Sequence, residues 1–404
     1  MKRLLIYCLL CMLPFMVTQA EIADSSVTVS LITCSPGQEA YALYGHTALR
    51  VRGTQPGPYD VVFNYGVFDF YASNFVWRFV LGQTDYLVLP CDYDLFMREY
   101  RHRGSQVVEQ VLNLTPYEAD TLSRDLWVNT IPANRVYRYD FFRNNCTTKA
   151  RDMIESHIDG VVVYPIRRPR YTYRQMIHQF TTEHPWSEVG NDLLLGVDAD
   201  TLISPRCEMF LPIYMMHYAD SAMIRTSRGA YRPLVKETNE LLAANPVAAQ
   251  RDADAQPSFP LSPKTLGWTV LALSLLVALW EYWKGKVCWV VDAVILTVQG
   301  LMGMLIAFMV LFSTHPTVGS NWQVWVLNPM PLFFLWWVVK AERQGKRHPY
   351  HVVAAGLMFA FLCATPFLHQ VYSSFFMPLT LTFFSRSLIH LILTTDVAQH
   401  HNKP

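Results

Sequence analysis

Two short segments carry the side chains best suited to chemistry, an imidazole in residues 44–51 and a thiol in residues 141–148. His46 follows Gly45 at the beginning of a predicted strand, where a side chain can project over a cleft. Cys146 lies where an extended segment gives way to a predicted helix. The partial positive charge at a helix N-terminus lowers the pKa of a thiol, and a histidine can supply the base that a nucleophilic thiol needs. The two segments together predict a thiol catalyst.

Asn64 is the candidate for a group that orients the imidazole. It lies on the predicted strand 60–65, which follows the strand that His46 begins, and an adjacent strand can bring the amide within reach of the ring and fix its tautomer. The alternative is a structural amide before the turn at Gly66. Cys34 is the rival nucleophile, but it lies at the end of a predicted strand and no helix terminus activates it.

The N-terminal residues predict export. Residues 1–20 begin with positive charge, continue with an apolar stretch and end in a small residue, which is typical of a secretory signal peptide. Residues 21–231 have the mixed composition of a globular domain, and residues 232–262 have that of a linker. An exported compartment permits disulfides, so a structural thiol is the alternative to catalysis. The cysteines of the exported domain are Cys34, Cys91, Cys146 and Cys207.

The last part of the chain predicts a five-span membrane domain over residues 263–396. Lysine and arginine gather in the loops after the first and third apolar runs and are absent from the other two loops. The positive-inside rule therefore places the N-terminal domain outside and the tail, residues 397–404, in the cytoplasm. The signal peptide predicts the same orientation. The five apolar runs of membrane-spanning length are residues 266–282, 287–312, 324–339, 352–372 and 376–393.

Polar residues of the membrane domain are candidates for contact with substrate or lipid. The outer loop between the second and third runs contains His315, Asn321 and Asn328, which could hold a lipid headgroup or a protein N-terminus. An ordinary interfacial loop is the alternative. Arg386 lies inside the fifth run, where a charge is costly and indicates a function. For Asp292, near the cytoplasmic end of the second run, snorkelling to the interface is the alternative.

The exported domain is predicted to be α+β with mainly antiparallel strands. A net charge of +1 argues against a nucleic-acid binder. No metal site and no cofactor is expected, because the histidines lack neighbours at metal-ligand spacing. The predicted strands are residues 26–33, 47–52, 60–65, 86–89 and 106–112, residues 137–142 are predicted as a strand or an extended entry to the next helix, and the predicted helices are residues 116–129 and 147–157.

The order strand, Gly-His, strand and then Asn-Cys at a helix start resembles circularly permuted papain-like enzymes. More specifically, four segments resemble the Lnb family of bacterial lipoprotein N-acyltransferases, which joins a periplasmic domain to a five-span membrane domain. The segments are residues 31–37 (Leu-Ile-Thr-Cys-Ser-Pro-Gly), 45–50 (Gly-His-Thr-Ala-Leu-Arg), 63–66 (Phe-Asn-Tyr-Gly) and 139–148 (Tyr-Asp-Phe-Phe-Arg-Asn-Asn-Cys-Thr-Thr). The resemblance covers essentially the whole mature chain and implies a permuted papain-like fold for the exported domain.

The resemblance implies transfer of an acyl chain from a phospholipid to the α-amino group of a diacylglyceryl-cysteine lipoprotein. Cys146 would be the nucleophile and His46 the base, while Asn64 as orienting group is inferred from the papain-like pattern. The implied location is the bacterial inner membrane, with the catalytic domain in the periplasm. Two alternatives stay open. One is a cysteine hydrolase acting on cell-wall peptides or lipids, since a fold does not fix a substrate, and the other is a non-enzymatic membrane sensor or scaffold.

Overall fold

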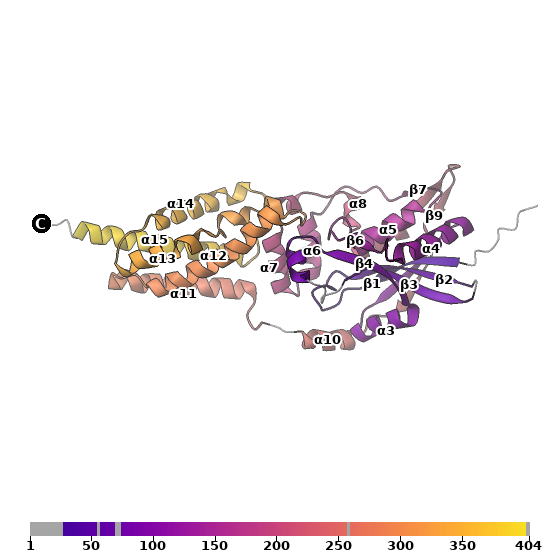
Figure 1. Cartoon of the computed structure of the whole chain (residues 1–404), viewed down its shortest axis with the longest axis horizontal. Coiled ribbons are helices and arrows are strands. Elements are labelled where there is room, and N and C mark those ends of the chain that lie inside the picture. The colour runs from indigo at the N-terminus through magenta and orange to yellow at the C-terminus, as the bar shows by residue number, and fades with distance from the viewer. Residues whose placement is uncertain (1–26, 55–56, 69–73, 257–258, 401–404) are drawn as a thin grey trace, which may run out of the picture.

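The computed structural model describes residues 27–54, 57–68, 74–256 and 259–400, and the predicted signal peptide lies outside these ranges. The molecule is elongated, with a sheet-containing N-terminal domain at one end and a bundle of helices at the other (Figure 1). The predicted α+β domain followed by five apolar helices is confirmed.

A seven-stranded antiparallel sheet with the order β10-β5-β1-β2-β3-β4-β6 forms the centre of the N-terminal domain. Successive residues of a strand face opposite sides, so the central strands supply two separate cores. Leu49 and Val51 lie in one core and Ala48 lies in the other, as their alternation predicts. The strands are β1 (Val27–Cys34), β2 (His46–Gly53), β3 (Tyr59–Val67), β4 (Asp85–Asp92), β5 (Val107–Leu112), β6 (Val136–Arg138) and β10 (Val235–Leu242).

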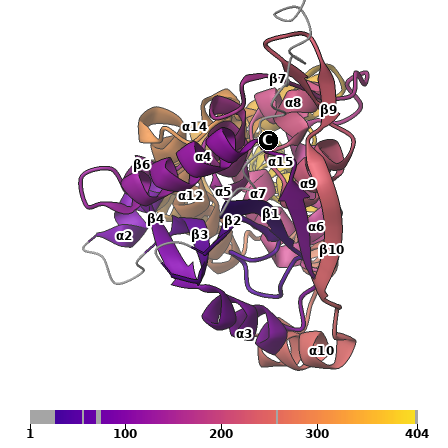
Figure 2. The ribbon, with the colours of Figure 1, turned by 90° about the vertical axis from the view of Figure 1, so that its right-hand side faces the viewer.

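Helices cover both faces of this sheet (Figure 2). One face carries α4 (Pro116–Thr130), α5 (Cys146–Ser156) and α9 (Pro212–Asp220), whose buried residues share a core with Phe63. The other face carries α3 (Tyr93–Arg103), which brings Phe96 into a core with Ile32. A smaller sheet has the order β7-β8-β9. The smaller elements are β7 (Gly160–Val163), β8 (Met223–Thr226), β9 (Tyr231–Pro233), α2 (Phe75–Val80), α6 (Tyr173–Thr181), α7 (Pro185–Leu194), η1 (Val197–Asp200) and α8 (Pro205–Glu208).

The predicted linker over residues 232–262 is wrong in its first part. Strand β10 pairs with β5 and forms an edge of the large sheet. Helix α10 (Pro246–Ala255) follows Asn245, whose backbone N–H donates to the Gly104 carbonyl at 2.9 Å. The polar composition was misleading because ladder hydrogen bonds hold an edge strand whose side chains can remain in solvent. The N-terminal domain therefore extends at least to Leu242.

In the segment 137–142, which the sequence predicts as a strand or an extended entry, the strand β6 ends at Arg138. The Asp140 carboxylate accepts hydrogen bonds from the backbone N–H groups of Phe142 at 2.9 Å and Arg143 at 3.0 Å. A side chain that satisfies local backbone donors in this way competes with a strand ladder and favours a turn. The turn delivers the chain to the beginning of α5.

Five helices long and apolar enough to cross a membrane form the C-terminal part of the chain. The fifth is the innermost, because 61% of the residues in its most apolar stretch are buried, against 22–33% in the corresponding stretches of the other four. Apolar side chains such as Leu276, Leu311 and Phe333 are exposed on the outside of the bundle, where lipid can solvate them. The helices are α11 (Pro263–Lys284), α12 (Trp289–Phe312), α13 (Met330–Arg343), α14 (Pro349–Ala364) and α15 (Phe376–His400), and η3 (Trp322–Trp325) precedes α13 within the third span.

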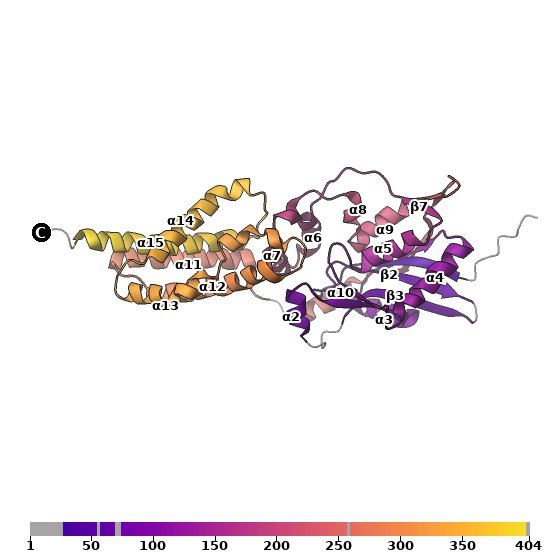
Figure 3. The same cartoon turned by 45° about the horizontal axis from the view of Figure 1, so that its top comes forward.

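Helix α7 joins the two parts of the molecule at one end of the bundle (Figure 3). Leu193 of α7 packs against the apolar cluster of the bundle. The Gln323 side-chain amide donates to the Asp192 carbonyl at 2.6 Å, and the backbone N–H of Gly196 donates to the Thr317 carbonyl at 3.2 Å. These contacts fix the N-terminal domain directly on the bundle end that the predicted orientation places outside the cell.

Candidate active site

Cys146 is the first residue of α5, as the sequence predicts. Asn145 caps the helix: its side-chain oxygen accepts from the N–H groups of Thr147 and Thr148, both at 2.9 Å, and its own N–H donates to the Thr148 hydroxyl at 2.9 Å. The Asn145 amide also donates to the Phe210 carbonyl at 2.8 Å, which fixes the cap to the rest of the domain. The thiol therefore sits where the helix N-terminus favours its ionised form.

The three predicted site residues lie together although they come from three elements. His46 begins β2, and Asn64 lies on the neighbouring strand β3. The Nε2–H of His46 donates to Oδ1 of Asn64 at 3.1 Å. This bond fixes the proton on Nε2 and leaves Nδ1 for the hydrogen bond between His46 and Cys146.

The charges of the thiol and the imidazole stabilise each other. Burial opposes ionisation of Cys146, but the charge of His46 and hydrogen bonds from His46 and the Thr47 backbone outweigh it and lower the thiol pKa. Burial likewise opposes protonation of His46, but the charge of Cys146 and hydrogen bonds to Cys146 and Asn64 leave the imidazole pKa raised. Opposite shifts of this kind favour a thiolate–imidazolium pair at neutral pH.

Gly45 determines how the chain enters β2. Its φ is +76°, and a Cβ at this position would lie 2.5 Å from the carbonyl oxygen of Cys34. Only glycine combines this left-handed backbone with such a close approach. Gly45 thereby sets the position of the imidazole that follows it.

We expect Gly45→Ala to destabilise the N-terminal domain by about 1–3 kcal/mol, because the new methyl group meets backbone and the positive φ is strained. Displacement of His46 should also slow alkylation of Cys146 by iodoacetamide at neutral pH. Thermal unfolding and the alkylation rate measure both effects. The matched control is Gly190→Ala in α7, where a Cβ meets nothing within 4 Å and the stability should be unchanged or slightly higher. Equal behaviour of the two variants would contradict this role for Gly45.

Sequence reasoning missed several groups around the thiol. The Thr47 hydroxyl lies 3.0 Å from the Thr147 hydroxyl, which in turn lies 3.8 Å from Sγ of Cys146. A Cβ on Gly66 would lie 3.5 Å from Cβ of Cys146 and 3.9 Å from the Tyr137 hydroxyl. Thr47 directly follows His46 and Thr147 directly follows Cys146, so their positions in the sequence could have identified them as residues of the site. Nothing in the sequence marks Tyr137, which reaches the site from the edge strand β6.

Cys34 is not poised for chemistry. It is 1% exposed, and burial raises the pKa of its thiol. Its partner across the β1–β2 ladder is His46, yet the thiol packs in the core with Phe96 beneath α3. The cysteines among the described residues are all free thiols. Of the two thiols, Cys146 is therefore the one whose surroundings favour ionisation, and Cys34 is part of the core.

The site lies toward the bundle. Strand β3, which carries Asn64, precedes α2 in the chain, and the Trp77 ring of α2 lies 5.0 Å from the Phe308 ring of α12. Tyr44, two residues before the imidazole, accepts a hydrogen bond from Asn191 of α7 at 2.7 Å. The segment before His46 therefore contacts α7, and the chain after Asn64 leads to α2, and both of these helices contact the bundle.

Two of the outer-loop residues, His315 and Asn321, join the two parts of the protein, while contact of this loop with lipid or substrate stays a prediction. His315 Nε2 lies 2.6 Å from the Phe79 carbonyl of α2, and the Asn321 amide donates to the Leu193 carbonyl of α7 at 2.7 Å. The Asn328 amide donates to the carbonyl three residues earlier at 3.1 Å, and its oxygen accepts from the backbone N–H of Met330 at 3.2 Å. The hydrogen bonds of these three side chains are made within the protein.

Arg386 is likewise enclosed by protein and does not face lipid. Its guanidinium donates to both carboxylate oxygens of Glu281 at 2.7 Å, and to those of Asp292 at 2.6 and 2.9 Å. All three side chains are at most 2% exposed. Asp292 therefore does not snorkel to the interface, and the arginine that is costly in lipid is neutralised by two paired carboxylates from α11 and α12.

Two groups of side chains in the described ranges are close enough to share a metal ion, and neither includes the candidate dyad. In the group of His178, Glu188 and Asp192, the Asp192 carboxylate already binds the Arg174 guanidinium at 2.6 Å, which compensates its negative charge. The second lies among the membrane helices. The groups are His178, Glu188 and Asp192, and Glu342, His351 and His390.

Two known domain families match this sequence, one in each part of the molecule. Residues 15–179 match the Lnb N-terminal periplasmic domain, and residues 254–397 match the Lnb transmembrane domain. The chain belongs to the Lnb family. It is accordingly a multi-pass membrane protein whose N-terminal domain is periplasmic. Neither the curated proteins nor the solved structures searched contain a significant match to this Lnb protein.

Proposed function

We propose that this Lnb protein is a lipoprotein N-acyltransferase of the bacterial inner membrane. It would move an acyl chain from a phospholipid, through a thioester on Cys146, to the α-amino group of diacylglyceryl-cysteine on exported lipoproteins. The observation that carries the proposal is the paired Cys146 and His46 in a domain docked directly on five membrane helices. The family assignment supports the same reaction.

The first half-reaction uses the thiolate as nucleophile. Sγ of Cys146 attacks the carbonyl carbon of an acyl ester, and the backbone N–H of Cys146 at the start of α5 would stabilise the resulting oxyanion, because the N–H groups of Thr147 and Thr148 already donate to the Asn145 cap. The intermediate then expels the glycerol oxygen, which takes the proton from Nδ1 of His46. The products are a thioester on Cys146 and a lysophospholipid.

The second half-reaction uses the neutral imidazole as base. An α-amino group has a pKa of about 8, so part of it is neutral and nucleophilic at neutral pH. Its nitrogen attacks the thioester carbon, His46 accepts the amine proton, and the carbon–sulfur bond breaks. The thiolate reforms beside the imidazolium, and the lipoprotein leaves with an amide-linked chain.

Two other functions predict different products. A cysteine hydrolase on the same site would transfer the acyl group to water or cleave a cell-wall peptide, and a sensor or scaffold would transform nothing. Docking of the domain on the membrane bundle favours a lipid substrate over a soluble wall peptide, because hydrolysis of a wall peptide needs at most an anchor.

The proposal is tested with the full-length protein in phospholipid vesicles that contain a synthetic diacylglyceryl-cysteine peptide. We expect N-acylated peptide and lysophospholipid to form in equal amounts, as followed by mass spectrometry. Free fatty acid without N-acylated peptide would support the hydrolase and overturn the proposal. Unchanged lipid and peptide would overturn it in favour of a hydrolase of cell-wall peptides or of a sensor or scaffold.

The hydrogen bond from His46 to Asn64 gives a prediction for pH dependence. Activity requires thiolate and imidazolium, so it falls below the lowered pKa of Cys146 and above the raised pKa of His46. Asn64→Ala removes a bond that raises the His46 pKa, so the alkaline limb of the kcat/KM profile should move to lower pH. We expect kcat/KM to fall by about 10-fold or more, a part of what a positioned acid–base contributes.

The control for this experiment is Asn113→Ala, which removes an amide directly after β5 whose side chain donates to the Pro233 carbonyl. Its pH profile should match that of the wild type. An alkaline limb that does not move in Asn64→Ala would show that the amide does not act through the imidazole.

A further inference from the structure

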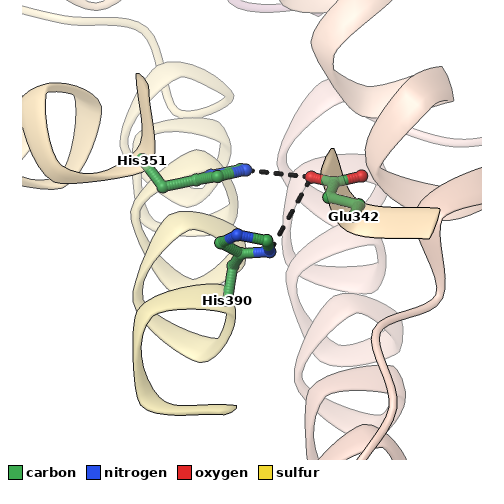
Figure 4. Close-up of side chains that lie close together, drawn as sticks. All are labelled: Glu342, His351 and His390. Atoms are coloured by element: carbon green, nitrogen blue, oxygen red, sulfur yellow. Dashed lines mark hydrogen bonds and ion pairs between the residues drawn. The ribbon is translucent and has the colours of Figure 1, made fainter. Parts of the chain in front are cut away.

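Three side chains from three membrane helices meet at the end of the bundle away from the periplasmic domain (Figure 4). Glu342 lies near the end of α13, His351 near the start of α14 and His390 in α15. We propose that Glu342, His351 and His390 bind a divalent first-row transition metal ion. This inference does not depend on the acyl-transfer activity, because the cluster lies in a different part of the molecule from Cys146.

The three ligand atoms face a common point. Nε2 of His351 lies 2.9 Å from Oε1 of Glu342, and Nδ1 of His390 lies 4.0 Å from the same oxygen. Each residue offers one ligand atom, and these atoms all lie within 4.8 Å of one another. Bonds of about 2.0–2.1 Å from a tetrahedral ion place ligand atoms about 3.3 Å apart, so small side-chain rotations bring all three into range.

Unpartnered polar atoms point to a missing ligand. His390 is fully buried, and neither of its ring nitrogens has a hydrogen-bond partner among the described residues. Oε2 of Glu342 and Nδ1 of His351 also lack partners within the described ranges. Buried polar groups in proteins are nearly always satisfied. A metal ion would occupy the free lone pairs of both the imidazole and the carboxylate.

The charges of the buried polar residues also favour a cation. Among the buried side chains of the described membrane helices, the three carboxylates of Glu281, Asp292 and Glu342 stand formally against one guanidinium, that of Arg386, which is an excess of acidic groups. A divalent ion would compensate that excess. Protonation of both histidines would compensate the carboxylates less favourably than a metal ion. The two rings are stacked with centroids 4.0 Å apart, so two imidazolium ions would repel each other.

The donor set indicates the type of metal. Two imidazole nitrogens and one carboxylate oxygen suit zinc, ferrous iron and related ions, whereas magnesium and calcium prefer oxygen ligands. The sequence predicted no metal because the three residues have no metal-ligand spacing along the chain. They become neighbours only when α13, α14 and α15 pack, so the ion would tie three helices together.

The test is the metal content of the full-length protein purified in detergent, measured by inductively coupled plasma mass spectrometry. We expect about one transition metal ion per chain in the wild type. The ion should be lost in His390→Asn and in Glu342→Gln. It should be retained in the control His217→Ala, which changes an exposed histidine of the periplasmic domain. Glu342→Gln keeps an oxygen that can accept from His351, so it separates loss of metal from loss of the fold.

A second measurement uses zinc directly. Protein stripped with chelator should gain thermal stability when zinc is added, and this gain should be absent in Glu342→Gln but present in His217→Ala. The proposal is overturned if the wild type binds no metal and zinc does not change its Tm. It is also overturned if the cluster variants retain as much metal as the control.

Discussion

Replacement of Cys146 by alanine is expected to abolish N-acylation, with a loss of about 10⁴-fold or more, as for removal of other catalytic nucleophiles. The physical reason is that Cys146 supplies the only thiol of α5, and the hydroxyls of the neighbouring threonines are much weaker nucleophiles. In cells that carry only this variant, mass spectrometry of lipoprotein N-termini should detect the diacyl form with a free amine. The N-terminal domain should still fold, because the Asn145 cap uses none of the thiol atoms.

The matched control is Cys34→Ala, which removes a thiol on the strand that pairs with the beginning of β2. Its activity should remain near that of the wild type, while its stability falls by about 1 kcal/mol because a buried side chain is shortened. The assignment of the nucleophile would be wrong if Cys34→Ala were inactive and Cys146→Ala were active. An unchanged N-acyl chain in Cys146→Ala cells would contradict the proposed function itself.

Replacement of Arg386 by glutamine should be the most destabilising single change in the bundle. It leaves the carboxylates of Glu281 and Asp292 buried without a countercharge, and breaking a buried ion pair from one side costs about 3–5 kcal/mol. We expect a large fall in the Tm of the detergent-solubilised protein, measured by thermal unfolding. Combining Arg386→Gln with Glu281→Gln and Asp292→Asn should recover part of the loss, because neutral amides can hydrogen-bond to one another.

The control for the bundle is Lys346→Gln, which removes an exposed positive charge from the loop between α13 and α14. Its Tm should stay close to that of the wild type, since exposed charges contribute little to stability. If Arg386→Gln were as stable as this control, the ion pairs of Arg386 with Glu281 and Asp292 would not hold α11, α12 and α15 together.

The candidate site could be predicted from sequence because its residues occupy marked local positions. Cys146 follows Asn145 and precedes Thr147 and Thr148, which is a helix-start signal, and alternation identified the strands on both sides of His46. Packing of α5 against β2 then brings the two segments together. Tyr137 reaches the site through the pairing of β6 with β4, and a three-residue strand leaves no pattern that would reveal it.

Other features were missed for different physical reasons. Helix α3 has a recognisable start at Asp92, whose side chain accepts from two backbone N–H groups, and an end at Gly104 in the left-handed conformation. Both residues mark the ends of the helix in the sequence itself. Strand β10 was hidden because an edge strand can be polar. The contacts of Arg386 and His390 could not be predicted, because membrane helices that look alike in hydropathy do not reveal which faces meet.

The central claim is that Cys146 carries the acyl chain during transfer. The most direct test is the mass of the intact protein, or of its peptide that contains Cys146, after incubation with phospholipid alone and without the amine acceptor. We expect an added mass equal to one acyl chain, located on Cys146, removed by neutral hydroxylamine and discharged by a diacylglyceryl-cysteine peptide. An active protein without any acyl adduct on Cys146, or with the adduct on another residue, would contradict the account.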